Sequence, residues 1–180
     1  KKYKSKVLKM NEASTKTITA VNEPIKSYEP GSPEKESIKK EIERLKSSQV
    51  EIPIIINGEE IKTGDTANCV MPHNHNHVLA TYHQASDKEI NLAIQSCLKA
   101  QKEWASTSLN ERCDIFQNMA NLLQNKYRDI INASTMLGQS KNIFQAEVDS
   151  ACELIDFFNF NCQYAQEIYA NQPCISPEGF

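Results

Sequence analysis

Glu153 is the acidic residue whose predicted surroundings could give a carboxylate a chemical role. Steps of three or four residues along a helical pattern place the acid Glu153 in a row with aromatic residues. The row consists of Ala146, Ser150, Glu153, Phe157, Phe160 and Tyr164. A carboxylate buried there without a partner would have a raised pKa, or would need a cation or hydrogen-bond donors against it. Glu153 therefore either receives the cationic group of a small ligand, makes a salt bridge within the fold, or reaches the helix edge.

Two other patterns suggest chemistry more weakly. His73, His75 and His77 alternate with asparagines, and in an extended strand their imidazoles would lie on one side, within reach of a metal ion. The segment follows Pro72, so a loop with ordinary hydrogen bonds is the favoured interpretation. The sequence from Gly138 to Asn142 precedes a helix and could receive an anion, but it lacks the glycine spacing of a nucleotide-binding loop. A simple corner between two helices is favoured.

The six cysteines predict reduced thiols. They are widely spaced, include no Cys-x-x-Cys pair, and several lie in apolar helical patterns. This distribution is typical of core thiols in a reducing compartment and not of a disulfide scaffold. The cysteines are Cys69, Cys97, Cys113, Cys152, Cys162 and Cys174.

Five helices are expected to position these residues. The first spans about 33–47, with Ser32 as its N-cap and a proline at its first position. Capping boxes at Ser86 with Glu89 and at Ser108 with Glu111 open the second and third helices of the chain. A short helix over about 126–137 ends at Gly138, a favourable C-cap. The last helix runs over about 142–169.

A small amount of β structure is also expected. A β-branched run from Ile52 to Ile56 meets Asn57-Gly58, the dipeptide that favours a tight hairpin turn, and residues 60–62 form the returning strand. A further strand is predicted across His77 to His83, after a loop over 72–76. The last helix is apolar around much of its circumference, so it needs more covering surface than these elements provide.

Composition limits the classes of function. The chain has 180 residues, 39% hydrophobic and 24% charged, as in a soluble globular domain. Its net charge of -3 disfavours nucleic acid as a partner, and no apolar run approaches the roughly 20 residues of a membrane span. Residues 1–20 carry lysines without apolar periodicity and are predicted to form a flexible basic tail, which also suits the remnant of an organelle transit segment.

Beyond these patterns, the sequence resembles the N-terminal third of the Δ1-pyrroline-5-carboxylate dehydrogenases, within the aldehyde dehydrogenase superfamily. The similarity runs in register from about residue 21 to residue 177. It is carried by Ala20–Ile25, Gly31–Glu34, Ile52-Pro53, Asn74–His77, Lys102–Trp104, Met136–Gln139, Gln145–Glu147 and, most specifically, Glu153–Asn161. The resemblance implies an α/β fold in which residues 21–180 are the incomplete N-terminal part of a Rossmann-like NAD-binding domain.

The resemblance also implies an activity. In the family, NAD oxidises L-glutamate γ-semialdehyde to glutamate in proline catabolism, in the mitochondrial matrix of eukaryotes, and the enzymes form homodimers or higher homo-oligomers. A cysteine thiolate attacks the aldehyde, an asparagine and a backbone N–H hold the oxyanion, and a glutamate activates water. None of these groups matches a residue here, so the catalytic and NAD-binding residues are expected beyond this segment.

One family role maps onto this sequence. The family's substrate anchor, which lies near the amino group of the substrate, corresponds to Glu153. Two departures stand out: Gly138 to Asn142 reads Gly-Gln-Ser-Lys-Asn where the family has Gly-Gln-Gly-Lys-Thr, and Ser176-Pro177 runs almost directly into Glu178-Gly179-Phe180. The leading hypothesis is an inactive fragment that functions with the remainder of its polypeptide. The alternative is a catalytically dead relic that acts as a structural interaction module.

Overall fold

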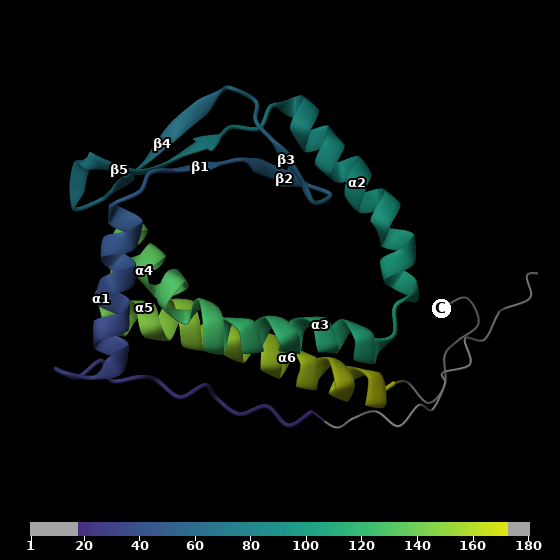
Figure 1. Ribbon diagram of the computed structural model, residues 1–180. Helices are drawn as coiled ribbons and strands as arrows, with labels where there is room; N and C mark the ends of the chain where they lie inside the picture. Colours follow the sequence, from purple (N-terminus) through teal and green to yellow (C-terminus); the bar gives the residue numbers. More distant parts are fainter. Residues whose placement is uncertain (1–17, 173–180) are drawn as a thin grey trace, which may run out of the picture.

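The computed structural model describes residues 18–172, in which helices predominate over a small amount of sheet (Figure 1). Residues 1–17 of the predicted tail, and Cys174 with the residues around it, lie outside this range. The helices are α1 (Pro33–Lys46), α2 (Asp87–Ser106), α3 (Leu109–Leu122), α4 (Arg128–Gln139), α5 (Ile143–Ala146) and α6 (Glu153–Ala170), with two π-helical segments, η1 (Leu123–Tyr127) and η2 (Glu147–Cys152). The strands are β1 (Val50–Ile52), β2 (Ile54–Ile56), β3 (Glu59–Ile61), β4 (Thr66–Met71) and β5 (Asn74–His83).

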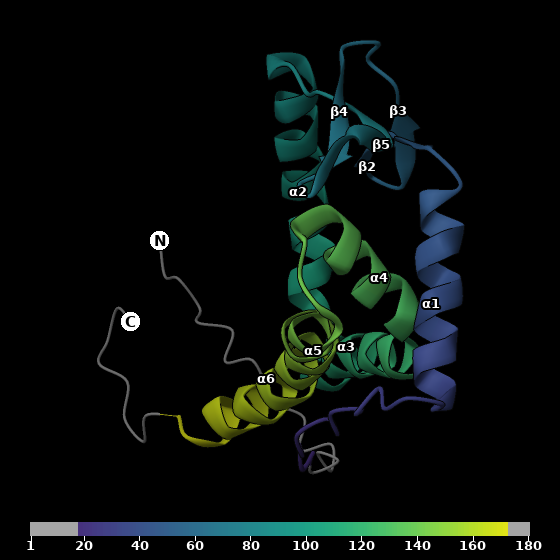
Figure 2. The ribbon, with the colours of Figure 1, turned by 90° about the vertical axis from the view of Figure 1, so that its left-hand side faces the viewer.

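The strands and most of the helices form two layers. In Figures 1 and 2 the strands lie above the paired helices α3 and α6, and α1 and α2 run between the two levels at opposite ends. β5 is the middle strand of a three-stranded sheet, parallel to β1 and antiparallel to β4, while β2 and β3 form a separate hairpin. No described helix combines the length and hydropathy of a membrane span.

Two clusters of buried side chains hold the helices together. Where α1 crosses α4, Tyr28 packs with Ile38 and Ala133. Where α3 meets α6, Ala120, Leu123 and Ile155 are buried against one another. η2 contacts both α4 and α6, and these three segments carry the candidate site.

Several sequence predictions are confirmed. α1 begins after its Ser32 cap, and both predicted capping boxes are present at Ser86 and Ser108. The hairpin turn is formed by Asn57 and Gly58 with φ of 53° and 79°, the left-handed values that this dipeptide accepts at low cost. The Gly138 segment is a corner between helices, as expected.

Other predictions are wrong in detail. β4 was not expected, and its pairing with β5 extends β5 back to Asn74, so the predicted loop over 72–76 shrinks to a turn. Gly138 lies inside α4 and is not its cap; Ser140 takes the left-handed conformation instead, with φ of 56°. The Ser140 hydroxyl hydrogen-bonds His73 Nδ1 at 2.7 Å, a tertiary contact that favours this position for the helix end.

The last predicted helix is a helix with a change of register. Its predicted span of about 142–169 agrees with α5, η2 and α6, which follow one another without a break from Ile143 to Ala170. The interruption is η2, where the hydrogen-bond spacing widens to i→i+5. Side-chain periodicity does not reveal such a segment, because one widened turn leaves the apolar pattern almost unchanged.

Candidate functional site

Glu153 is exposed, at the first position of α6. Its backbone N–H donates to the carbonyl of Val148, five residues earlier. Its neighbours in the predicted row are not a buried stripe either: Phe157 is 60% exposed and Phe160 is half-buried. Among the described residues, no group hydrogen-bonds or ion-pairs with the Glu153 carboxylate. The idea of an acid buried among aromatics therefore does not hold for Glu153 in this part of the chain, and its side chain is free to receive a ligand.

The buried acid is instead Glu147, which is 0% exposed at the start of η2. Its Oε1 accepts from the Lys26 backbone N–H at 2.8 Å, and its Oε2 accepts from the Tyr28 hydroxyl and the Asn132 amide, both at 2.8 Å. Arg128 donates to both oxygens through Nε and Nη2. This is a bidentate ion pair of the kind that makes a buried carboxylate tolerable.

Arg128 connects this acid to the extended segment that precedes α1. Its Nη1 donates to Glu23, its Nη2 donates to the Pro24 carbonyl at 2.9 Å, and the same nitrogen lies 3.3 Å from Cys152 Sγ. The guanidinium, 4% exposed, therefore touches acids on two separate parts of the chain. It joins α4, η2 and the N-terminal segment into one buried polar network.

The environment fixes the charges of this network. Burial acts to raise the pKa of Glu147, but the Arg128 ion pair and the Lys26 and Tyr28 hydrogen bonds outweigh it and lower the pKa. Burial acts to lower the pKa of Arg128, and its two carboxylate partners reverse that effect. Burial raises the pKa of the Cys152 thiol to about 11, so this thiol is protonated at neutral pH and is a poor nucleophile.

Sequence reasoning missed this network. Gln145–Glu147 was noted only as part of a family resemblance, and Arg128 was not singled out. A usable signal existed, because Glu147 lies in a strongly apolar helix and Arg128 opens the helix before it. A buried acid requires a cation, and Arg128 is a candidate in the neighbouring helix.

The remaining sequence candidates have ordinary surroundings. His73 lies at a turn and bonds Ser140, while His75 and His77 lie in β5. Within residues 18–172, no three His, Cys, Asp or Glu side chains are grouped so that they could hold a metal ion. The five described cysteines are free thiols, and Cys113, Cys152 and Cys162 are buried, in keeping with the predicted core thiols.

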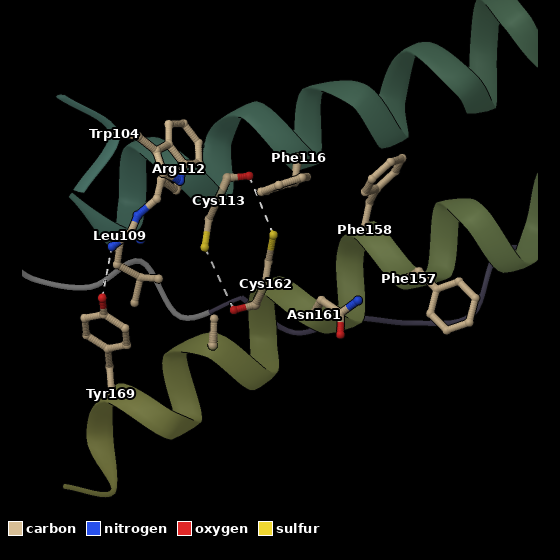
Figure 3. A pocket seen from close by; sticks show the side chains of 11 residues that line it. Trp104, Leu109, Arg112, Cys113, Phe116, Phe157, Phe158, Asn161, Cys162 and Tyr169 are labelled. Carbon is tan, nitrogen blue, oxygen red and sulfur yellow. Dashed lines mark hydrogen bonds between the residues drawn. The ribbon is translucent and has the colours of Figure 1, made fainter. Parts of the chain in front are cut away.

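A second feature is an apolar groove of about 440 Å³ between α3 and α6 (Figure 3). Trp104, Phe116 and Phe158 line it, and the thiols of Cys113 and Cys162 each bond the other residue's carbonyl across it. Arg112 donates to the Tyr169 hydroxyl at 3.0 Å through Nη2. Its Nε is buried and has no hydrogen-bond partner in the described part of the chain. The groove therefore presents aromatic surface and one unused donor.

The sequence of the chain matches the pattern of the "Aldehyde dehydrogenase family" over residues 60–178. The chain therefore belongs to the aldehyde dehydrogenase family, and its α/β architecture is the N-terminal portion of that fold, as the resemblance implied. Within the family it is 40% identical over 175 residues to the mitochondrial Delta-1-pyrroline-5-carboxylate dehydrogenase of Dictyostelium discoideum, a match that covers 97% of this chain and 31% of that protein.

Two further relatives support this position. The mitochondrial Delta-1-pyrroline-5-carboxylate dehydrogenase of Homo sapiens is 39% identical over 163 residues, covering 91% of this chain and 29% of that protein. The crystal structure of the Delta-pyrroline-5-carboxylate dehydrogenase from Mycobacterium tuberculosis bound with NAD superposes with a TM-score of 0.88 at 35% identity, covering 92% of this chain and 31% of that one. The chain thus spans about a third of the length of these relatives.

Proposed function

We propose that this chain is the N-terminal part of an NAD-dependent dehydrogenase that oxidises L-glutamate γ-semialdehyde to glutamate in proline catabolism. The observation that carries the proposal is the 40% identity over 175 residues to the Dictyostelium discoideum dehydrogenase. Identity at this level extends through nearly the whole chain, so it includes the candidate site and not only the fold.

Glu153 is the proposed substrate-binding residue. An exposed carboxylate without a partner among the described residues can accept charge-assisted hydrogen bonds from the α-ammonium group of the semialdehyde. The ion pair Arg128–Glu147, in contrast, is buried and already satisfied, so it has no capacity left for a ligand. The two acids therefore have different proposed roles: Glu147 stabilises the fold, and Glu153 binds the substrate.

NAD, which accepts hydride in this class of reaction, is proposed to bind to residues beyond this segment. The described residues do not form a dinucleotide site. Ser32, Ser86, Ser108 and Asn142 already cap the helices that they precede, so those N-termini offer little to a pyrophosphate. The parallel pair of β1 and β5, moreover, is not followed by a glycine-rich turn into a helix.

The exposed apolar surface of α2 supports an incomplete domain. Glu89 is the only residue of α2 that is buried, and α2 makes few contacts with the described chain, chiefly with β2. Its apolar face is open, with exposed Ile90, Ile94, Leu98 and Trp104. Such a continuous apolar face is unusual on a complete domain. We propose that the remainder of the same polypeptide covers this face and the groove of Figure 3, and that residues 1–180 alone are inactive.

The proposed compartment is the mitochondrial matrix. The Dictyostelium discoideum and Homo sapiens relatives are named as mitochondrial, and free buried thiols suit a reducing interior. A homodimer or higher homo-oligomer is the proposed assembly, on the family resemblance alone. A small molecule is the proposed substrate.

The test is an assay of the native polypeptide that contains this chain. Its intact mass should lie far above 20.4 kDa, and with L-glutamate γ-semialdehyde it should reduce NAD+ at a saturable rate. Residues 1–180 alone should give neither turnover nor tight NAD+ binding. If the native polypeptide has a mass near 20.4 kDa and is inactive, the dehydrogenase proposal fails and the interaction-module alternative is supported; turnover by residues 1–180 alone would contradict the assignment of the missing parts.

A further inference from the structure

The buried ion pair joins two π-helical segments. η1 ends at Tyr127, directly before Arg128, and η2 begins at Glu147 itself. π-helical turns are rare, cost helix stability and often occur at functional sites. Each π-helical segment thus lies next to, or contains, one partner of the Arg128–Glu147 ion pair. The position of η2 has a physical reason.

The hydrogen-bond spacing of η2 supplies that reason. In a π turn residues i and i+5 lie on nearly the same face of the helix, whereas in an α-helix they would be turned away from each other by about 140°. Glu147 and Cys152 are five residues apart, and both touch the guanidinium of Arg128, Cys152 at 3.3 Å. In an α-helical register, these two side chains could not both reach Arg128.

The π register of η2 also sets the position of Glu153. It follows Cys152 directly, and its own backbone N–H makes the i→i+5 hydrogen bond to Val148. A second tether lies in the middle of η2, where the Ser150 hydroxyl donates to Thr135 Oγ1 of α4 at 2.6 Å. Each residue of register change turns the following helix by about 100°, so loss of the π register would point the Glu153 side chain elsewhere.

We infer that Glu147 and Arg128 are positioning residues for Glu153. Their ion pair, together with the contact between Arg128 and Cys152, holds η2 in π register. The π register in turn sets the direction in which the Glu153 carboxylate meets the ammonium group of the substrate. This inference rests on the proposed role of Glu153. Neither positioning residue touches the substrate. Their effect on binding is therefore specific to the group that Glu153 recognises.

The test compares two aldehydes on the intact dehydrogenase. L-Glutamate γ-semialdehyde carries the α-amino group, and 5-oxopentanoate is the same aldehyde without it. Glu147→Gln should raise KM for the amino-bearing aldehyde at least tenfold while KM for 5-oxopentanoate and for NAD+ changes less than twofold. Cys152→Ala is a milder change that leaves the ion pair in place and removes the thiol contacts with Arg128, Glu147 and the Pro24 carbonyl at the end of η2. It should shift the ratio of the two KM values about threefold in the same direction.

Two matched variants separate the possible outcomes. Glu167→Gln removes an exposed acid further along α6 and should leave both KM values unchanged. Glu153→Gln should raise KM for the amino-bearing aldehyde alone. If it does so and neither Glu147→Gln nor Cys152→Ala shifts the KM ratio, or if both aldehydes are affected equally, the positioning role is refuted. If Glu153→Gln itself has no effect, the proposed substrate site is wrong. Should Glu147→Gln fail to fold, the Cys152→Ala ratio decides.

Discussion

At the scale of single residues, two acids six positions apart have opposite surroundings. Glu147 accepts six hydrogen bonds in the interior, one of them from the Cys152 thiol, while Glu153 has no partner among the described residues. The buried Glu147 carboxylate needs Arg128 as its counter-ion, whereas the exposed Glu153 carboxylate can bind a ligand. Substitutions at the two sites should therefore affect different properties.

Glu153→Gln in the intact dehydrogenase should lower kcat/KM for L-glutamate γ-semialdehyde by about 10- to 100-fold, since a hydrogen bond to a charged group contributes about 1.5–3 kcal/mol. Affinity for NAD+ should stay the same. Steady-state kinetics with each substrate varied in turn checks this. An unchanged kcat/KM would remove Glu153 from the site.

Arg128→Met should destabilise the protein by about 3–5 kcal/mol, because it leaves the Glu147 carboxylate buried without its cation. Denaturant unfolding measures the loss. Arg44→Met is the matched control: Arg44 pairs with Glu41 on the exposed surface of α1, and removing it should have a much smaller effect. Similar losses for the two variants would show that the Arg128 network contributes no more than a surface pair.

The lowered pKa of Glu147 predicts a pH dependence of stability. Its folded pKa lies below the value of about 4.3 for an unfolded glutamate, so the folded state binds fewer protons and the contribution is complete above that pH. It is lost as the pH falls through the folded pKa. The difference in stability between wild type and Glu147→Gln should therefore be largest near neutral pH and shrink below about pH 4. A difference that grows on acidification would contradict the charge assignment.

At the scale of elements, local sequence signals set where helices begin, and tertiary contacts set how they continue. Tertiary contacts also fix the extended segment that precedes α1. Asp156 accepts from the Glu23 backbone N–H at 2.6 Å and from the Asn22 amide at 2.8 Å, and Gln163 accepts from the Ala20 N–H at 2.8 Å. Side chains of α6 thus satisfy an extended backbone that pairs with no strand in the described part of the chain, including Ile18 and Ala20 at the end of the predicted flexible tail.

The capping box of α3 gives an element-scale prediction. Ser108 accepts from the Glu111 N–H at 3.2 Å, and the Glu111 carboxylate accepts from the Ser108 N–H at 2.9 Å. Ser108→Ala should cost about 1 kcal/mol, and Ser108→Asp should retain most of the stability, because an aspartate also caps well. Thermal unfolding of the two variants checks this, and equal losses would mean that the cap contributes little.

At the scale of the whole molecule, the uncovered apolar surface dominates behaviour. The open face of α2 and the groove between α3 and α6 meet at Trp104, which belongs to α2 and also lines the groove. A chain with two such surfaces should associate with itself or bind apolar dyes. The intact polypeptide should do neither.

Purified residues 1–180 are therefore expected to show strong fluorescence with an apolar dye and concentration-dependent association in sedimentation. The intact dehydrogenase at the same concentration should give weak dye fluorescence. A soluble, sharply melting monomer of residues 1–180 with no dye binding would disprove the need for further covering surface, and with it the proposal of an incomplete domain.

The sequence by itself determined the elements with strong local signals. Ser32, Ser86 and Ser108 specify helix starts, and Asn57-Gly58 specifies the hairpin, because in each case the residue type satisfies a backbone requirement within a few positions. The family could also be recognised from the sequence, because a comparison of aligned residues does not require knowledge of the tertiary contacts.

Only the tertiary structure decided which acid is buried and where the helices change register. Glu147 is tolerated inside because Arg128, nineteen residues away, and Lys26 and Tyr28, more than a hundred residues away, converge on it. The same convergence holds η2 in a register that helical periodicity cannot show, and the Ser140–His73 contact moves the end of α4 past Gly138. Hydrogen bonds between residues distant in sequence leave no local pattern, so these features could be read only from the fold.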